Sequence, residues 1–192
     1  ERSDVAMPSL LKRWRLTVDD YHRMAKAGIL HEDDRVELIE GELIEMATIG
    51  SYHFTSVNNL NQEFSGRSSG RFIVSVQNPV RVSRHSEPRP DIALLRPRAD
   101  KYAGGLPGPE DVLLIVEVSD PTVAADRRVK LPLYAAAGIP EAWLVNIPRR
   151  SIEVHREPRG GRYQQVTVFR KGERIALLLL LDVTVAVEDI LP

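Results

Sequence analysis

Two carboxylates draw attention because each lies at one end of a stretch with the pattern of a β-strand. Asp91 opens the apolar run 91–95, and Glu117 follows the apolar residues 112–116. A charge at the edge of so apolar a strand needs a partner. Two carboxylates held close together repel one another unless a cation or a proton lies between them. An all-oxygen ligand set suits Mg²⁺ or Mn²⁺, so the pair predicts a metal site at Asp91 and Glu117.

The residue types alone also allow a structural role, in which Asp91 caps a turn and Glu117 pairs with a surface arginine. The absence of cysteine narrows the chemistry. It excludes disulfides, thiolate zinc sites, iron–sulfur clusters and a cysteine nucleophile, so a metal would need oxygen or imidazole ligands. A chain without cysteine also suits a reducing compartment, and we expect a cytoplasmic protein.

Length and composition indicate one globular domain. The chain has 192 residues, of which 43% are hydrophobic and 28% charged, which is enough to bury a core. We expect residues 1–16 to be a frayed N-terminal segment and residues 17–192 to form a single domain. The longest apolar run, Ile175–Leu181, is far shorter than the ~20 residues of a membrane helix, and no secretory leader is recognisable.

The overall charge argues against strong non-specific binding to nucleic acid. The net charge is −1 and the pI is about 6.6, whereas a dedicated nucleic-acid-binding domain usually has a pI above about 9. Of the 26 basic residues, 21 are Arg and only 5 are Lys. A local strip of arginines remains compatible with this balance.

Periodicity and turn residues predict the elements that must position the two carboxylates. The expected helices are 17–28, capped by Thr17, then 51–65, capped by Ser51, and 123–137. A hairpin is centred on Gly41 within 35–47. The expected strands are 72–76, 79–82, 91–95, 112–118, 142–147, 152–155, 163–169 and 183–187. This order predicts an α/β fold, a mixed sheet flanked by helices with an N-terminal helix and hairpin.

Several motifs, in this order and spacing, make the chain similar to a known family. They are Val36-Glu-Leu-Ile-Glu-Gly-Glu, His53, Arg89-Pro-Asp-Ile-Ala, Ile115-Val-Glu-Val-Ser, Asp126 with Lys130 and Tyr134, and Ala137-Gly-Ile-Pro-Glu-Ala-Trp-Leu-Val. They resemble the Uma-type endonuclease family, formerly a domain of unknown function, within the restriction-endonuclease-like PD-(D/E)XK superfamily. The resemblance implies a restriction-endonuclease-like fold and metal-dependent cleavage of nucleic acid, with Asp91 and Glu117 holding Mg²⁺ or Mn²⁺ and the Val118 carbonyl as a further ligand.

The superfamily pattern ends in Glu-x-Lys, but the third residue here is Ser119. A serine cannot offer a positive charge to the attacking water or to the developing phosphorane. Of the five lysines, only Lys130 follows the Glu117 strand at a depth that its side chain can span. We therefore expect Lys130 to replace the missing lysine. The alternative is a surface ion pair between Asp126 and Lys130, and Pro132 is expected to disturb this helix just beyond Lys130.

Other candidates carry a weaker signal. His53 occupies the position of the family histidine, where it could bind the scissile phosphate or tune a metal-bound water, although a lone histidine also serves as a cap or a core polar group. Glu42 could be a third acid or a turn carboxylate, and Tyr134 shares a helix stripe with Lys130. The arginines that flank the Asp91 strand could hold phosphates or simply be solvated. They are Arg81, Arg84 and Arg89.

We accordingly expect a metal-dependent nuclease that hydrolyses DNA phosphodiester bonds, with Asp91, Glu117, Lys130 and His53 as catalytic residues. DNA is expected more than RNA, no membrane is expected as a partner, and a homodimer would allow two strands to be cut. The first alternative is a nuclease-fold module that binds nucleic acid or protein without catalysis. The second is a metal-dependent hydrolase of small phosphoesters.

Overall fold

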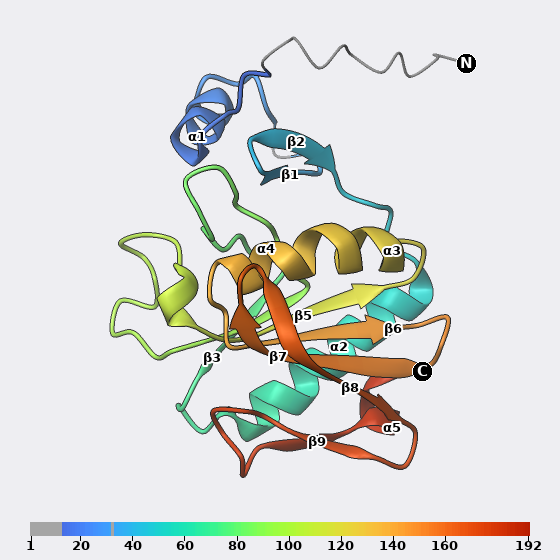
Figure 1. Cartoon of the computed structure of the whole chain (residues 1–192). Coiled ribbons are helices and arrows are strands. Elements are labelled where there is room, and N and C mark those ends of the chain that lie inside the picture. Colours follow the sequence, from blue (N-terminus) through green and yellow to red (C-terminus); the bar gives the residue numbers. More distant parts are fainter. Residues whose placement is uncertain (1–12, 32) are drawn as a thin grey trace, which may run out of the picture.

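A computed structural model describes residues 13–31 and 33–192. A six-stranded mixed sheet lies at the centre, in the spatial order β3-β4-β5-β6-β7-β8 (Figure 1). Its strands are β3 (Ile73–Val76), β4 (Ile92–Leu95), β5 (Val112–Ser119), β6 (Glu141–Asn146), β7 (Ser151–Arg159) and β8 (Arg162–Arg170). The predicted α/β fold is therefore confirmed. The predicted frayed segment lies mostly outside the described residues; within its last part, the Leu16 N–H donates to the Gly41 carbonyl.

Neighbouring strands are antiparallel except for β5 and β6, which are parallel. Two parallel neighbours need a crossover rather than a hairpin. The crossover here is a helical segment made of α3 (Val123–Ala125), a π-helical turn η2 (Asp126–Lys130) and α4 (Leu131–Ala136). All eight residues of β5 are buried, as expected of a central strand that helices cover on both faces.

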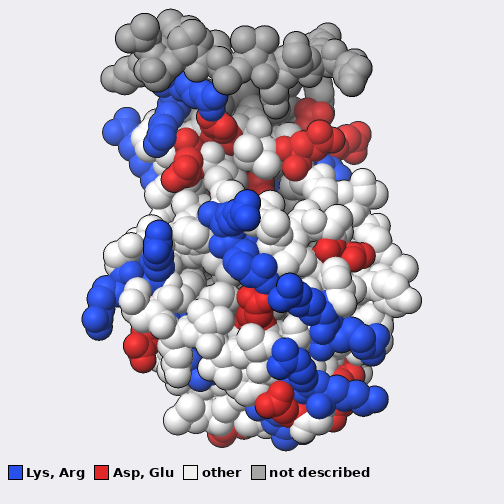
Figure 2. Space-filling model, turned by 45° about the vertical axis from the view of Figure 1, so that its right-hand side comes forward, with Lys and Arg blue, Asp and Glu red and all other residues white. Residues whose placement is uncertain are grey.

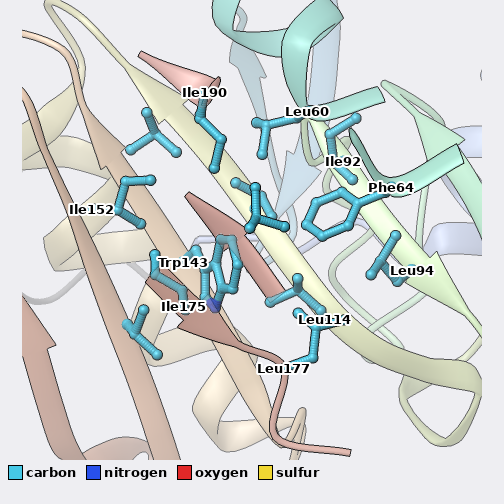
Figure 3. Close-up of a cluster of buried hydrophobic side chains, with 14 of the residues drawn as sticks. Leu60, Phe64, Ile92, Leu94, Leu114, Trp143, Ile152, Ile175, Leu177 and Ile190 are labelled. Carbon is cyan, nitrogen blue, oxygen red and sulfur yellow. The ribbon is translucent and has the colours of Figure 1, made fainter. Parts of the chain in front are cut away.

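The helices divide the apolar residues between two faces of the sheet. Helix α2 (Ser51–Ser68) covers one face and the α3–η2–α4 crossover covers the other (Figure 1). On the α2 face, Leu60 and Phe64 pack with Ile92, Leu114 and Trp143 in the larger core cluster (Figure 3). The C-terminal pair β9 (Arg174–Ala176) and β10 (Thr184–Ala186), with α5 (Val187–Ile190), closes this core through Ile175 and Ile190.

Helix α1 (Val18–Lys26) and the hairpin of β1 (Val36–Ile39) and β2 (Glu42–Glu45) form a smaller unit above the crossover (Figure 1). The predicted Thr17 cap is present: its hydroxyl accepts the Asp20 N–H at 3.1 Å and the Asp20 carboxylate accepts the Thr17 N–H at 2.9 Å, as in a capping box. The Glu87 N–H donates to the Leu38 carbonyl at 2.8 Å. This bond joins the hairpin to the loop that leads into β4.

Gly41, at the hairpin turn, has a φ of +83°, and an added Cβ would lie 2.6 Å from the Arg15 Cβ. We expect Gly41→Ala to lower the free energy of unfolding by about 2–4 kcal/mol, because left-handed backbone costs about 1–2 kcal/mol and the contact adds about 1–2 kcal/mol of overpacking. Gly28→Ala is the matched control, since Gly28 has a φ of +72° with nothing within 4 Å of an added Cβ. Urea unfolding of both variants measures the difference, and equal losses would show that the Arg15 contact contributes nothing.

Four expectations about elements were wrong in detail. Residues 79–82 do not form a strand, because the loop folds on itself: Val80 N–H donates to Pro88 and Val82 N–H to Ser86, and prolines in this loop cannot donate to a ladder. Helix α2 is capped by Gly50 rather than Ser51, which is its first residue. The segment 123–137 is not one regular α-helix. Residues 183–187 end in α5, and β9 was not expected.

Candidate active site

The register of β4 and β5 brings Asp91 and Glu117 together. Ile92 pairs with Val116 in the antiparallel ladder, so the next pair outward is Asp91 and Glu117. Residues that face each other directly in such a ladder carry their side chains on the same face, about 5 Å apart. Both residues are buried, with 7% and 3% of their surface exposed. The two predicted metal ligands therefore lie side by side on the sheet.

Three donors hold the Asp91 carboxylate in place. The Val118 N–H donates to Oδ2 at 2.8 Å, the Gln77 side-chain amide donates to Oδ1 at 3.1 Å, and His53 Nε2 lies 3.1 Å from the carboxylate. Because the donors come from β5, from the loop after β3 and from α2, they fix the orientation of the carboxylate. Asp91 does not serve as a turn cap.

Glu117 is contacted by the crossover helix. Lys130 Nζ lies 3.3 Å from Glu117 Oε2, and the Tyr134 hydroxyl donates to Oε1. The structure thus brings Asp91, Glu117, Lys130 and His53 to one place. Lys130 does not form the alternative surface pair with Asp126, and Glu117 does not pair with a surface arginine.

Glu37 of β1 is a third buried acid that the sequence analysis did not single out. Its Oε1 lies 3.1 Å from Lys130 Nζ, and its Oε2 accepts the Arg89 backbone N–H at 3.0 Å. The lysine ammonium therefore lies between a carboxylate of the sheet and a carboxylate of the N-terminal hairpin. The signal that could have identified Glu37 is its place inside the motif Val36-Glu-Leu-Ile, where it alternates with the apolar residues that pack the hairpin.

Burial and the neighbouring charges both shift the pKa values of Glu117 and Lys130. Burial raises the pKa of Glu117 well above its usual range; the Lys130 ammonium lowers it, while the nearby carboxylates of Asp126, Asp91 and Glu37 raise it further. Burial by itself lowers the pKa of Lys130, but the carboxylates of Glu117, Glu37 and Asp126 raise that pKa above its usual value. Lys130 therefore stays charged. The carboxylates around it repel one another, and a shared proton or cation would reduce this repulsion.

The π-helical turn η2 sets the position of Lys130. The Leu131 N–H donates to the Asp126 carbonyl, which is the i→i+5 bond of a widened turn. Pro132 follows immediately and has no N–H to give to residue 128, so a regular α-helical bond is impossible there. The predicted disturbance near Pro132 is present, but it lies on the N-terminal side of the proline and includes Lys130 itself.

Ser119, at the superfamily lysine position, is fully buried. Its hydroxyl donates to the Asp126 carboxylate at 2.6 Å. The serine therefore ties the end of β5 to the start of the widened turn. The nearby Asp126 carboxylate is also one of the groups that raise the pKa of Glu117.

The four candidate residues line one pocket of about 560 Å³ between the hairpin and the sheet. Its wall also includes the segment 44–50 that joins the hairpin to α2, and the start of the crossover at residues 120–122. Its charged residues are eight acids and five bases. The acids are Glu37, Glu40, Glu42, Glu45, Asp91, Glu117, Asp120 and Asp126, and the bases are Arg13, Arg15, Arg35, Arg89 and Lys130.

The remaining candidates lie at different depths. His53 lines the pocket with its Nδ1 buried and without a hydrogen-bond partner. Glu42 is half exposed and pairs with Arg13 at 2.8 Å. Arg89 lines the pocket, whereas Arg81 pairs with Asp19 at 3.3 Å and Arg84 is exposed.

The side chains present suit a hard divalent cation. Within residues 13–31 and 33–192, no three His, Asp or Glu side chains form a ready-made metal cage. Mg²⁺ does not require one, because it keeps several waters and is usually held by one or two carboxylates. Glu37 and Glu117 share a single lysine and Asp91 is buried nearby, so three buried carboxylates face one ammonium, and this imbalance of charge fits one further cation.

Comparison with known proteins bears on the family and the fold. A sequence model of the Uma2 family, described as a putative restriction endonuclease, matches residues 18–188. A crystal structure from Anabaena variabilis, described as a putative nuclease of the DUF820 family, superposes with a TM-score of 0.70 at 15% identity, over 91% of this chain and 97% of the other. No curated protein matches the chain. No helix among the described residues is long and apolar enough to cross a membrane. The family model spans nearly the whole fold and includes His53, Asp91, Glu117 and Lys130. The chain therefore belongs to the Uma2 family of putative restriction endonucleases.

Proposed function

We propose that this protein is a divalent-metal-dependent endonuclease that hydrolyses phosphodiester bonds of DNA. The observation that carries the proposal is the meeting of Asp91, Glu117 and Lys130 in one pocket, although the lysine comes from the crossover helix and not from the strand. Family membership supports nuclease chemistry. Cutting of both strands would further suggest a homodimer.

Asp91 and Glu117 would hold Mg²⁺ or Mn²⁺, which supplies Lewis-acid stabilisation of charge on the scissile phosphate and lowers the pKa of a bound water. The Val118 carbonyl is proposed as a further ligand. The chain itself orients these groups: Gln77 and the Val118 N–H fix Asp91, and Tyr134 fixes Glu117.

Lys130 holds a positive charge at Nζ, where it can orient the attacking water and stabilise the negative charge that develops on the phosphorane. A compact ammonium suits this role better than the broad fork of an arginine. His53, beside Asp91, is placed to contact a phosphate or a metal-bound water.

The metal site is tested by titrating Mn²⁺ into wild type and Asp91→Asn by calorimetry. We expect the variant to lose Mn²⁺ binding by at least about tenfold, because one of two carboxylate ligands becomes neutral while its size is kept. In wild type, Mn²⁺ at 100 times its Kd should raise the stability by about 2.7 kcal/mol.

Asp182→Asn is the matched control, because Asp182 is an exposed carboxylate that pairs with Arg71 on the surface. It should bind Mn²⁺ as wild type does. Equal binding by wild type and Asp91→Asn would remove the site from consideration. Metal binding without cleavage of any nucleic acid would instead favour the non-catalytic binding module.

A further inference from the structure

One end of the central sheet carries basic side chains that the pocket does not use. The strands β5 and β6 both end there, and β7 begins there. Arg149 and Arg150 lie in the turn between β6 and β7, and Arg170 and Lys171 lie where β8 ends. All four side chains are exposed. We call these four residues the basic edge.

Strand register connects the basic edge to the pocket. Ser119 of β5 pairs with Asn146 of β6, Asn146 pairs with Ser151 of β7, and Ser151 pairs with Arg170 of β8. Asp120 and Thr122, which follow Ser119, line the pocket. Three strand spacings of ~4.8 Å therefore separate the pocket wall from Arg170. This distance of about 14 Å is close to the axial length of four base pairs at 3.4 Å each.

The basic edge keeps its positive charge. Nearby ion pairs among the described residues engage Arg127 with Glu153 and Arg156 with Glu141; none involves the basic edge. Two acids lie beside it, and their printed partners are backbone N–H groups: Glu173 accepts that of Arg170, and Glu188 accepts that of Gly172. Figure 2, with this side of the molecule turned forward, shows Lys and Arg side chains in a diagonal band that few acidic side chains interrupt.

We propose that the basic edge binds the phosphate backbone of a DNA duplex whose scissile bond lies in the pocket. This inference rests on the proposed nuclease function, because it places the scissile bond in the pocket. The binding surface itself is separate from the catalytic groups. The chain has a net charge of −1, so affinity for a polyanion must come from a concentrated patch. Arginine is suited to it, because its guanidinium can contact a phosphate with two N–H groups.

The test compares two double variants at opposite ends of the β7–β8 hairpin. Arg149→Gln/Arg170→Gln removes two charges from the basic edge. Arg159→Gln/Arg162→Gln removes two exposed arginines at the β7–β8 turn, where Arg159 pairs with Arg162. Arg162 lies eight positions before Arg170 along β8, which places that turn about 26 Å from Arg170. Both variants lose the same charge, and only the position differs.

Binding of a fluorescent duplex of about 20 base pairs is measured in EDTA by anisotropy, between about 50 and 300 mM KCl. We expect the basic-edge variant to bind at least about tenfold more weakly at 0.1 M salt, with a log–log salt slope shallower by about 1.8, since each phosphate contact contributes about 0.9. The control variant should keep the wild-type slope. Equal losses in both variants, or wild-type binding by the basic-edge variant, would overturn the proposal.

Hydrolysis of a small chromogenic phosphodiester in Mn²⁺ separates the two proposals, because such a substrate reaches the pocket but not the basic edge. The basic-edge variant should hydrolyse it at the wild-type rate. If wild type hydrolyses neither this diester nor DNA, and the basic-edge variant still loses duplex binding, the binding surface stands and the nuclease proposal fails. If wild type hydrolyses both and the basic-edge variant binds duplex normally, the nuclease proposal stands and the binding surface fails.

Discussion

Glu117→Gln should reduce DNA cleavage by about 10³-fold or more, while the protein stays folded. A metal ligand contributes several kcal/mol of charge stabilisation, and each 1.36 kcal/mol is a factor of ten in rate. Glutamine keeps the shape of the side chain and can still accept the Tyr134 hydrogen bond. Because burial raises the pKa of Glu117, a neutral replacement removes a costly buried charge, and the thermal midpoint should not fall by more than a few degrees.

Plasmid nicking in Mn²⁺ measures the rate for Glu117→Gln, and calorimetric melting measures its stability. Glu110→Gln is the control, because Glu110 is an exposed carboxylate in the turn before β5 and its loss should change neither quantity. Full cleavage by Glu117→Gln would mean that the buried carboxylate serves the fold rather than the reaction.

Lys130→Ala should lose cleavage by roughly 10²–10³-fold, the effect of removing one preorganised charge stabiliser. The ammonium lies between Glu37 and Glu117, so its loss also leaves two buried carboxylates facing each other, and stability should fall by about 3 kcal/mol in the absence of metal. A surface ion pair with Asp126 would have made the substitution nearly neutral for stability, but only 14% of the Lys130 side chain is exposed. Mn²⁺ should restore much of the lost stability in Lys130→Ala.

Cleavage rates of Lys130→Ala and Lys26→Ala are compared in the same plasmid assay. Lys26 is exposed at the end of α1, so Lys26→Ala controls for the loss of one positive charge. Adding Ser119→Lys to the Lys130→Ala background tests whether a lysine at either position can supply the positive charge at the same place. This substitution also removes the hydrogen bond from Ser119 to Asp126. Wild-type cleavage by Lys130→Ala would exclude the proposed role of the lysine.

Much of the fold followed from patterns that are local in sequence. The apolar run of β5 and the cap of α1 at Thr17 could be assigned because a buried strand requires apolar residues and a helix cap favours residues such as threonine. The strand predicted at 79–82, which does not form, shows the limit of this approach. Its alternating valines match the two-residue period of a strand. The backbone instead follows the loop, because of the loop prolines and the hydrogen bonds to Pro88 and Ser86. β9 has only three residues, too few for a period to be recognised.

Site residues that lie in family motifs could be predicted from the sequence. Contacts that depend on how distant segments pair in three dimensions could not. Asp91 and Glu117 could be expected near one another, but only the register of β4 against β5 places them side by side. Glu37 could not be connected with Lys130, because 93 residues separate them and the contact depends on how the hairpin docks. Glu42, the residue after the turn glycine in the same motif, has the same residue type but is half exposed and pairs with Arg13.

The widened turn at residues 126–130 places one extra residue between two contacts of the crossover with β5. A turn closed by an i→i+5 bond holds one residue more than an α-helical turn, and in a regular helix one residue corresponds to about 100° of rotation and 1.5 Å of rise. Asp126 bonds to Ser119 on one side of that extra residue, and Tyr134 bonds to Glu117 on the other. The widened turn takes up this extra residue as a bulge, so the helical halves on either side both keep their contacts with β5. The crossover therefore holds Glu117 and Ser119 at the same time, although Pro132 prevents a regular helix between the two contacts.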